Sequence, residues 1–434
     1  MASPVCRVPS EIISEIFSWT VPSPSEMRRL RGSKVEQSPW ILGHICSCWR
    51  AIALSTSSLW SLVHMSSSRA ADPLSMIQTQ LERATVTLKI HFQFDRDWRD
   101  HELSAIQLFD LLLEHSTRWV ELNIQFTDAM LTRLTTLPRG RFPLLKRLLI
   151  EQNAFEYQLN AVRTIQCFEH APSLVDVGVI NSRPRDILVP LPAHQLTSYQ
   201  VQESWATHRP LLESAPNLIE ARILLAGSPD WSDHRGVIDM LNLQRLYVSH
   251  VEFLSYLWAP ALAEVASCVD SEEPLYISFN ALFRRSSCAP RRLCLRGLPD
   301  PRATARILKE YPSITNLILI FSATGDANTL SRFANSHLTI LGSPTNAPQL
   351  CEIYIASEKA FGINHSLFLS MLEARRNTLN HTALVMQCGP EPGPVAQSRL
   401  DALRVEGLDI WVNSGSRGAL EQIQRWKYAP SWVS

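Results

Sequence analysis

Glycine is scarce in this sequence, and an imbalance of charge is missing. The 434 residues include only 15 glycines, and none of them belongs to a glycine-rich loop of the kind that cradles phosphate groups. The 41 basic residues are balanced by 41 acidic residues, so no long-range field favours nucleic acid or an anionic membrane. No apolar run approaches the ~18 residues that a membrane-spanning helix needs. These absences argue against nucleotide chemistry, nucleic-acid binding and membrane insertion.

Signals for export and for disulfide formation are also missing. Residues 1–7 lack the apolar core of a signal peptide. The nine cysteines are an odd number with scattered spacing, which is typical of reduced thiols inside the cell. We therefore expect a cytoplasmic or nuclear protein, or one found in both compartments.

Catalytic and metal-binding motifs do not stand out. Cys46 and Cys48 are one residue apart in a helical pattern, so their thiols point in different directions and do not match a zinc-ligand spacing. The 13 histidines are dispersed, and none forms a helical pair that would bind zinc. Triads of serine, histidine and aspartate are recognised by geometry and stay open at this point. We expect no enzymatic activity, no metal and no cofactor.

Residues 9–62 carry more apolar surface than two or three short helices can bury by themselves. The first helix begins after Pro9, which suits a first helical turn, and prolines end it near residue 22. Four of its apolar residues have the i, i+1, i+4, i+5 spacing that predicts one shared helical face. These residues are Ile12, Ile13, Ile16 and Phe17.

A second helix is predicted over residues 41–53, and apolar residues cover more than half of its circumference. A helix of this kind is either buried or has a partner, and a segment of ~55 residues cannot easily enclose two such helices. The surplus is explained by a partner outside the chain or by a satellite core on the downstream domain. The polar insert between the helices, residues 21–38, is a solvated loop or a basic nuclear-import patch.

The first sixty residues resemble an F-box, and they are closest to the F-box-like domains of mushroom-forming fungi. The resemblance rests on three strings: Val-Pro-x-Glu-Ile-Ile-x-x-Ile-Phe, then Pro-Trp-x-Leu-x-x-Ile-Cys-x-x-Trp-Arg-x-Ile-Ala, then Ser-Leu-Trp. It covers about an eighth of the chain. One departure is Val8, where the family usually has leucine, and this removes about one methylene of burial, below ~1 kcal/mol.

The resemblance implies a function in ubiquitin ligation. In that family, the helices bind a Skp-type adaptor, which is held by a cullin scaffold in the SCF ubiquitin ligase. Residues 9–62 would then be the adaptor-binding domain, with 21–38 as its insert. The adaptor contacts that the resemblance implies are Pro9, Ile12, Ile13, Ile16, Phe17, Leu42, Ile45, Cys46, Trp49, Leu59 and Trp60.

A second pattern fills the rest of the chain, with apolar residues at i, i+3 and i+5 and often a proline just before them. Its middle apolar positions are 122, 148, 177, 199, 221, 246, 265, 295, 317, 353 and 403. Most steps between them lie near the ~20–29 residues of a leucine-rich repeat. Each L-x-x-L-x-L segment predicts a short strand whose alternate residues point into the core.

Helical patterns lie between these strands. They are Leu103/Ile106/Phe109/Leu112/Leu113, Leu159/Val162/Ile165/Phe168, Ala305/Ile307/Leu308, Leu367/Leu369/Met371/Leu372 and Leu420/Ile423/Trp426. Strands and helices that alternate at a regular period predict stacked units, each covering its neighbour. We therefore predict an α/β fold in which the N-terminal all-α helices precede an irregular leucine-rich-repeat-like solenoid of about ten repeats over residues 84–428. The repeats are degenerate, since only Asn153 fits the family's turn asparagine, and a non-solenoid α/β domain stays an alternative.

Target recognition is expected on strand positions that alternate with the buried ones. The candidates are Asn123, Arg147, Glu151, Arg222, Arg245, Tyr247 and Tyr354. Six arginines between residues 284 and 302 are either a solvated edge or a site for an acidic or phosphorylated segment. Three functions remain open: a substrate receptor of a ubiquitin ligase, a scaffold that binds the adaptor without directing degradation, and an enzyme on an α/β scaffold.

Overall fold

The structure is a computed structural model of the 434-residue chain. It describes residues 8–21, 38–66, 74–93, 102–152, 163–180, 187–226, 236–269, 274–322, 326–358, 363–386 and 391–414. The chain divides into two compact units; among the described residues, the first contains those up to Ser204 and the second those from Trp205 onward. Each unit is a mixed α/β body built on a parallel sheet.

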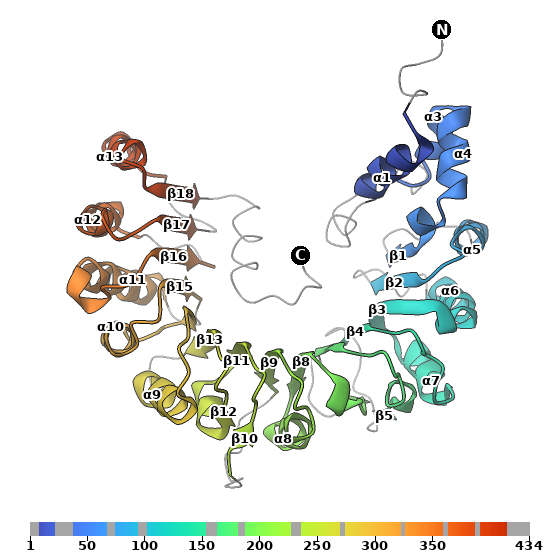
Figure 1. Cartoon of the computed structure of the whole chain (residues 1–434), viewed down its shortest axis with the longest axis horizontal. Helices are drawn as coiled ribbons and strands as arrows, with labels where there is room; N and C mark the ends of the chain where they lie inside the picture. Colours follow the sequence, from blue (N-terminus) through green and yellow to red (C-terminus); the bar gives the residue numbers. More distant parts are fainter. Residues whose placement is uncertain are drawn as a thin grey trace. The chain divides into compact units, whose positions relative to one another are not determined.

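The first unit begins with helices and continues with strands. The N-terminal helices are α1 (Ser10–Thr20), α3 (Leu42–Ile45), α4 (Ser47–Ser55) and the 3₁₀ helix η3 (Ser57–Trp60). The strands, in sheet order, are β1 (Leu62–Ser66), β2 (Leu88–Gln93), β3 (Trp119–Phe126), β4 (Arg147–Gln152), β6 (Asp176–Ile180) and β8 (Ser198–Glu203). Each pairs in parallel with the next. Helices α5 (Leu74–Arg83), α6 (Glu102–Glu114) and α7 (Asp128–Thr136) cover one side of this sheet (Figure 1).

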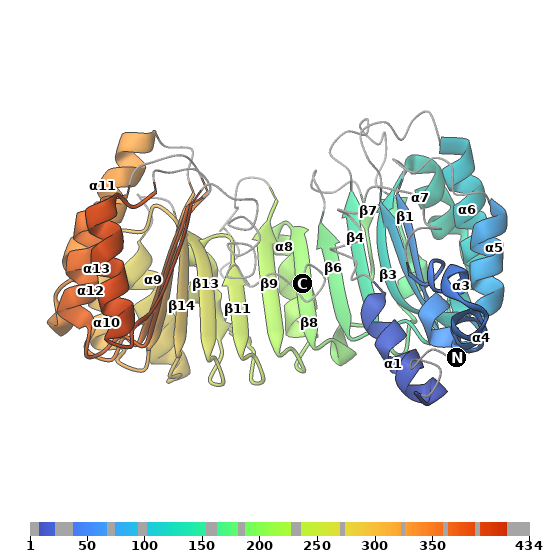
Figure 2. The ribbon, with the colours of Figure 1, turned by 90° about the horizontal axis from the view of Figure 1, so that it is seen from above.

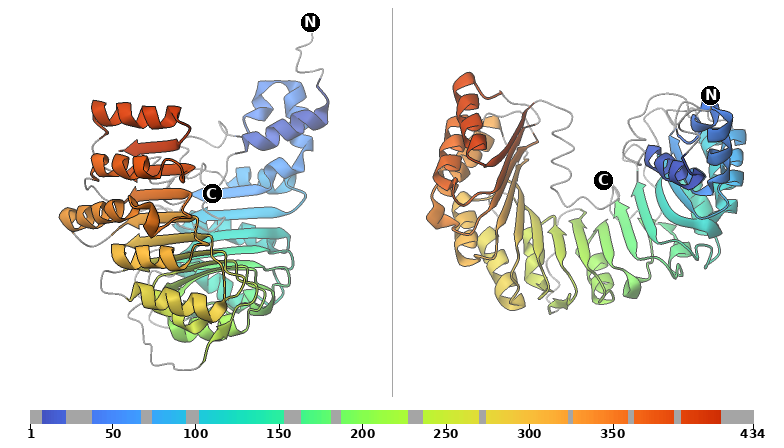
Figure 3. Two further views of the ribbon diagram at one scale, coloured as in Figure 1. Left: turned by 60° about the vertical axis from the view of Figure 1, so that its left-hand side comes forward. Right: turned by 45° about the horizontal axis from the view of Figure 1, so that its top comes forward.

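The second unit repeats strand and helix more regularly. Its strands, in sheet order, are β9 (Glu220–Leu225), β11 (Arg245–Val248), β13 (Glu264–Val269), β14 (Arg292–Gly297), β15 (Asn316–Phe321), β16 (Glu352–Ser357), β17 (His381–Met386) and β18 (Asp409–Ser414). Its α-helices are α8 (Trp205–Glu213), α9 (Leu275–Ser286), α10 (Pro301–Glu310), α11 (Ala327–Leu341), α12 (His365–Arg375) and α13 (Pro394–Val405). Figure 2 shows α9 to α13 as one layer beside the strands, and the orange and red elements of Figure 3 show the same arrangement.

The apolar positions that predicted the strands lie in register from strand to strand. In the first unit they are Val63, Ile90, Leu122, Leu148, Val177 and Tyr199. In the second they are Ala221, Leu246, Val265, Leu293, Leu317, Ile353, Thr382 and Ile410. These side chains face the helices, as the contact between Phe92 of β2 and Phe109 of α6 indicates, with ring centroids 6.1 Å apart. Alternation along each strand sends the residues between them to the opposite side, which we call the open face.

Nine of the eleven predicted middle positions are confirmed by this register, and two are wrong. Leu293, not Leu295, is the register neighbour of Leu317. The segment around Leu403 belongs to helix α13 and is not a strand. The strands that the pattern missed near the C-terminal end are β17 and β18, where Thr382 stands at the apolar position and is followed by Ile410. These two residues restore steps of 29 and 28 residues after Ile353.

Three of the predicted helices are confirmed as α6, α10 and α12. The predicted helix that ends at Phe168 is wrong in its described part, where the chain forms β5 (Arg163–Thr164) and the 3₁₀ helix η7 (Gln166–Phe168). The predicted helix of Leu420, Ile423 and Trp426 lies outside the described residues, as do Asn153 and most of the 21–38 insert.

Candidate protein-binding surface

Helix α1 has two neighbouring apolar stripes, about 100° apart around its axis, and only one of them is buried. Ile13 and Phe17, four residues apart, are buried. Ile12, Ile16 and Trp19 follow the i, i+4, i+7 spacing of a second stripe, and Trp19 is 76% exposed. The four residues that are predicted to share one face therefore divide between a buried stripe and an exposed stripe. One stripe holds the helix in the chain, and the other faces away from it.

The buried stripe of α1 packs on an aromatic core formed with the following helices. The ring of Phe17 lies 4.9 Å from that of Trp49 in α4, and Ser14 Oγ lies 3.0 Å from Thr56 Oγ1. A second pair, Trp40 and Trp60, meets edge to face at 4.9 Å. The N-terminal helices thus have an internal core of their own.

This core is attached to the first repeat by polar contacts. Trp60 Nε1 donates a hydrogen bond to the carbonyl of Ala53 at 2.8 Å. Gln80 of α5 donates to the carbonyls of Trp60 and Leu62 at 3.2 and 2.8 Å. The guanidinium of Arg83, also on α5, lies 4.4 Å from the centre of the Trp60 ring. These contacts fix η3, and through it the helices, against α5.

The predicted helix over residues 41–53 is interrupted at Cys46. This residue is extended, with φ −159° and ψ 168°, and it separates α3 from α4. Its thiol accepts a hydrogen bond from the backbone N–H of Trp49 at 3.4 Å and so caps α4. Arg50 Nε donates to the carbonyl of Gly43 at 2.7 Å, which joins the two short helices. The interruption turns Ile45 to the outside, where it is 54% exposed.

Exposed apolar side chains are concentrated on these helices. Seven of the nineteen large apolar side chains that are exposed within the described residues belong to the first 54 positions. They are Val8, Ile12, Ile16, Trp19, Ile41, Ile45 and Leu54. Such a concentration is typical of a protein-binding surface, because single exposed apolar residues are otherwise scattered. We call these seven residues the outer apolar surface.

The structure divides the eleven predicted adaptor contacts into two groups. Pro9, Ile12, Ile16, Ile45 and Cys46 are exposed, and Trp49 is half-buried. Ile13, Phe17, Leu42, Leu59 and Trp60 are buried among residues of the chain itself. The sequence reasoning missed Trp19, Ile41 and Leu54. Trp19 could have been found, since it stands seven residues after Ile12 on the same stripe.

The predicted target-contact residues lie on the open faces, but many of their polar groups are already engaged. In the first unit, Arg147 pairs with Glu121 at 3.2 Å and with Asp176 at 3.3 Å. Glu121 also accepts a hydrogen bond from His91 at 2.8 Å. Burial opposes ionisation of Glu121, but this hydrogen bond and the charges of His91 and Arg147 hold its pKa below the usual value. Arg147 is therefore part of a charged row and not a solitary cation.

Asn123 and Glu151 differ in their surroundings. Asn123 is fully buried, and both polar atoms of its amide lack a hydrogen-bond partner within the described structure. Glu151 accepts a hydrogen bond from Gln125 at 2.9 Å. The amide of Asn123 is thus a polar group that its own unit leaves unsatisfied.

The remaining candidates belong to the second unit. Arg245 pairs with Glu220 at 2.6 Å, and Tyr354 donates its hydroxyl to Glu352 at 2.9 Å. Arg222 lies over the ring of Tyr247, 4.6 Å from its centre. Burial lowers the pKa of Arg222 and raises that of Tyr247. Tyr247 is buried, so it is not an exposed strand position as expected.

The arginines between 284 and 302 are not gathered into one anion site. Arg285 donates to the carbonyls of Leu254 and Leu257, Arg292 pairs with Glu264 at 3.5 Å, and Arg296 pairs with Glu358 at 3.0 Å. Much of this positive charge is used inside the unit.

No protein-family model matches the chain, and no curated protein matches it. In the part of the chain that the structure covers, no group of three or more potential metal ligands occurs. Within the same ranges, no helix has both the length and the apolar character needed to cross a bilayer.

Proposed function

We propose that the protein is the substrate-recognition subunit of an SCF-type ubiquitin ligase. In this proposal, residues 9–62 form an F-box-like domain that binds a Skp-type adaptor and, through it, a cullin scaffold. Residues 84–428 form an irregular leucine-rich-repeat-like solenoid that holds the target protein. The chain contributes no catalytic group and acts by raising the concentration of its target near the ubiquitin-carrying enzyme.

The observation that carries the proposal is the outer apolar surface. The inner stripe of α1 is satisfied by Trp49 and its neighbours, so the outer stripe is surplus to the needs of the fold. Full burial of one such side chain is worth about 1.5–3 kcal/mol. Burial of Ile12, Ile16 and Trp19 together in a partner would therefore supply a substantial share of a specific interface.

The proposal is tested by measuring the affinity of the full chain for a Skp-type adaptor, with Ile16→Asp as the decisive variant. Ile16 is exposed in the free chain, so the change leaves the fold intact while placing a carboxylate in the interface. We expect the affinity to fall at least about 30-fold, or ~2 kcal/mol. The matched control is Leu103→Asp on α6, where leucine is 79% exposed and binding should stay within twofold of wild type.

Two outcomes would redirect the proposal. A wild-type chain that forms no complex with the adaptor, or equal losses in both variants, would contradict the assigned surface. Adaptor binding without ubiquitin transfer to a bound target, in an assembly reconstituted with cullin and ubiquitin-carrying enzyme, would leave a non-catalytic scaffold as the function.

A further inference from the structure

A groove lies between the neighbouring helices α5 and α6 of the first unit, which Figure 1 shows side by side. Its volume is about 650 Å³, within the range of ~300–1,000 Å³ that is usual for ligand sites. We call it the α5–α6 groove. It shares no residue with the outer apolar surface or with the predicted target contacts. Leucines supply its apolar surface, and charged and polar residues stand on both sides: Leu81, Glu82 and Thr85 on the α5 side, and Leu111, His115 and Arg118 on the α6 side.

Arg118 brings a positive charge into this groove. Its Nε and Nη2 atoms donate to the carbonyl of Val86 at 2.9 and 2.8 Å, which orients the guanidinium. Neither bond uses Nη1, so this atom is available to an acceptor in the groove. Within the described part of the chain, no carboxylate forms an ion pair with Arg118. In the next repeat, by contrast, Arg133 pairs with Asp110.

The two sides of the groove differ in their hydrogen-bonding character. On the α6 side, burial and the charge of Arg118 lower the pKa of His115, so its ring is neutral at pH 7 and can donate one hydrogen bond. On the α5 side, Thr85 gives its hydroxyl proton to Ser57 Oγ at 2.9 Å, which leaves its oxygen as an acceptor. Glu82 is exposed beside it. Positive charge and donors therefore face negative charge and acceptors.

This arrangement favours a peptide over a phosphorylated ligand. A phosphate group has a second negative charge, which Glu82 on the opposite side would repel. An acidic side chain has the single charge that Arg118 can pair with. The backbone N–H groups of the same peptide can donate to Glu82 and Thr85. A neighbouring apolar side chain would contact the leucines of the groove.

We propose that the α5–α6 groove binds a segment of a partner protein in which an acidic residue stands next to an apolar one. Arg118 pairs with the acidic side chain, and Leu81 and Leu111 contact the apolar one. This inference does not rest on the adaptor proposal, because no residue of the groove belongs to the surface assigned to the adaptor. Failure of either proposal would leave the other untouched.

The test is a selection of random seven-residue peptides, displayed on phage, against the full chain. We expect the enriched peptides to share an acidic residue next to an apolar one. The affinity of the synthesised consensus peptide is then measured by fluorescence anisotropy. Arg118→Glu should weaken it at least about tenfold. The matched control is Arg139→Glu, at an exposed arginine of the same unit, and it should stay within twofold of wild type. A library that yields no peptide, or peptides that bind Arg118→Glu as tightly as wild type, would overturn the proposal.

A second measurement does not depend on the folding of the Arg118 variant. The acidic residue of the consensus peptide is replaced by phosphoserine, and we expect this peptide to bind wild type at least about fivefold more weakly. The variant Glu82→Lys changes an exposed side chain and should remove this difference. Equal affinities of the two peptides for wild type would contradict the assigned site.

Discussion

The open faces of the two units differ in kind, although their helix-facing sides follow one pattern. In the first unit, the row that alternates with the core consists of His64, His91, Asn123, Leu149, Gly178 and Gln200. In the second unit, the corresponding row consists of Arg222, Tyr247, Ala266, Cys294, Ile318, Tyr354, Ala383 and Trp411. The first is largely polar, and the middle of the second is apolar.

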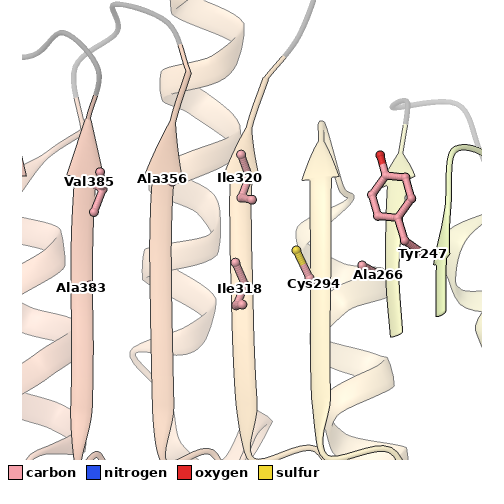
Figure 4. Packing of buried hydrophobic residues seen from close by; sticks show 8 residues of the cluster. All are labelled: Tyr247, Ala266, Cys294, Ile318, Ile320, Ala356, Ala383 and Val385. Atoms are coloured by element: carbon pink, nitrogen blue, oxygen red, sulfur yellow. The ribbon is translucent and has the colours of Figure 1, made fainter. Parts of the chain in front are cut away.

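The difference shows that the repeated apolar pattern predicts the residues on the helix-facing side of the sheet. It does not predict the residues on the open face. The i, i+3, i+5 pattern is set by packing against the helices, which both units share. The open face is free of that requirement, so it reflects what lies over it. The row of the first unit is polar and contains the unsatisfied amide of Asn123, so it suits a polar neighbour. The row of the second unit contains the buried side chain of Ile318 (Figure 4), so it suits an apolar one.

The largest expected effect comes from placing a polar group in the apolar row. Ile318→Asn removes a fully buried side chain and leaves an amide without partners, and the two losses should lower the free energy of unfolding by about 4 kcal/mol. Urea denaturation combined with hydrogen exchange of the β15 peptide measures this loss. Ile277→Asn on α9, where isoleucine is 67% exposed, is the control and should stay within ~0.5 kcal/mol of wild type.

A second prediction concerns the response of the second unit to acid. His337 of α11 is buried, and burial lowers its pKa to about 4, although its hydrogen bond to the carbonyl of Phe333 and the charge of Asp300 oppose the shift. The folded state then binds fewer protons than the unfolded state, whose histidine titrates near 6.5. We therefore expect the contribution of neutral His337 to the free energy of unfolding to be fully present above pH 6.5. It should be lost as the pH drops towards 4, a loss of roughly 3 kcal/mol.

Denaturation of the second unit at a series of pH values from 7 to 4 measures this loss, and His337→Gln should flatten the slope. The exposed His170→Gln of the first unit is the control and should leave the slope unchanged. In the first unit, Glu121 affects stability at lower pH than His337 does. Because its folded pKa lies below the usual value of 4.5, its contribution is present at neutral pH and is lost as the pH falls below that value. Equal slopes for the wild type and His337→Gln would contradict the role given to His337.

The smallest effect is expected from the reverse exchange in the first unit. Asn123→Leu replaces a buried amide that lacks partners with an apolar side chain of similar size. Removing an unsatisfied polar group is neutral or stabilising, so the midpoint of urea denaturation should rise by an amount equivalent to about 1 kcal/mol. A loss of stability would instead reveal that the amide has a partner in solution.

The strands that could be predicted from the sequence are those with a complete apolar pattern. Strands whose helix-facing residues are all apolar were predicted from spacing, and the α/β class followed from their alternation with helices. Strand β17 was missed because Thr382 occupies an apolar position; its hydroxyl is buried and donates to the carbonyl of Ile353 at 3.0 Å. A polar residue whose hydrogen bonds are made inside the core interrupts the apolar pattern but leaves the strand intact. Leu403 misled in the opposite way, since i, i+3, i+5 spacing also fits a helix.

The sequence predicted that the N-terminal helices exist, but it did not predict which side of each helix is buried. The apolar surplus was visible, but the burial of Ile13 and the exposure of Ile12 depend on where Trp49 and Trp60 pack. The interruption at Cys46 had no signal, because neither glycine nor proline marks it. Long-range contacts of this kind decide which side of a helix is free.

The charged row at the start of the strands limits how the array can change in length. In register, Glu220, Arg245, Glu264 and Arg292 alternate in sign, and neighbours pair at 2.6 Å for Glu220–Arg245 and 3.5 Å for Glu264–Arg292. Deleting the unit that carries Arg245 would set Glu220 beside Glu264, and like charges on adjacent strands are unfavourable. Deleting two neighbouring units would restore the alternation. Along this stretch, we therefore expect the gain or loss of two neighbouring repeats to cost less stability than the gain or loss of one.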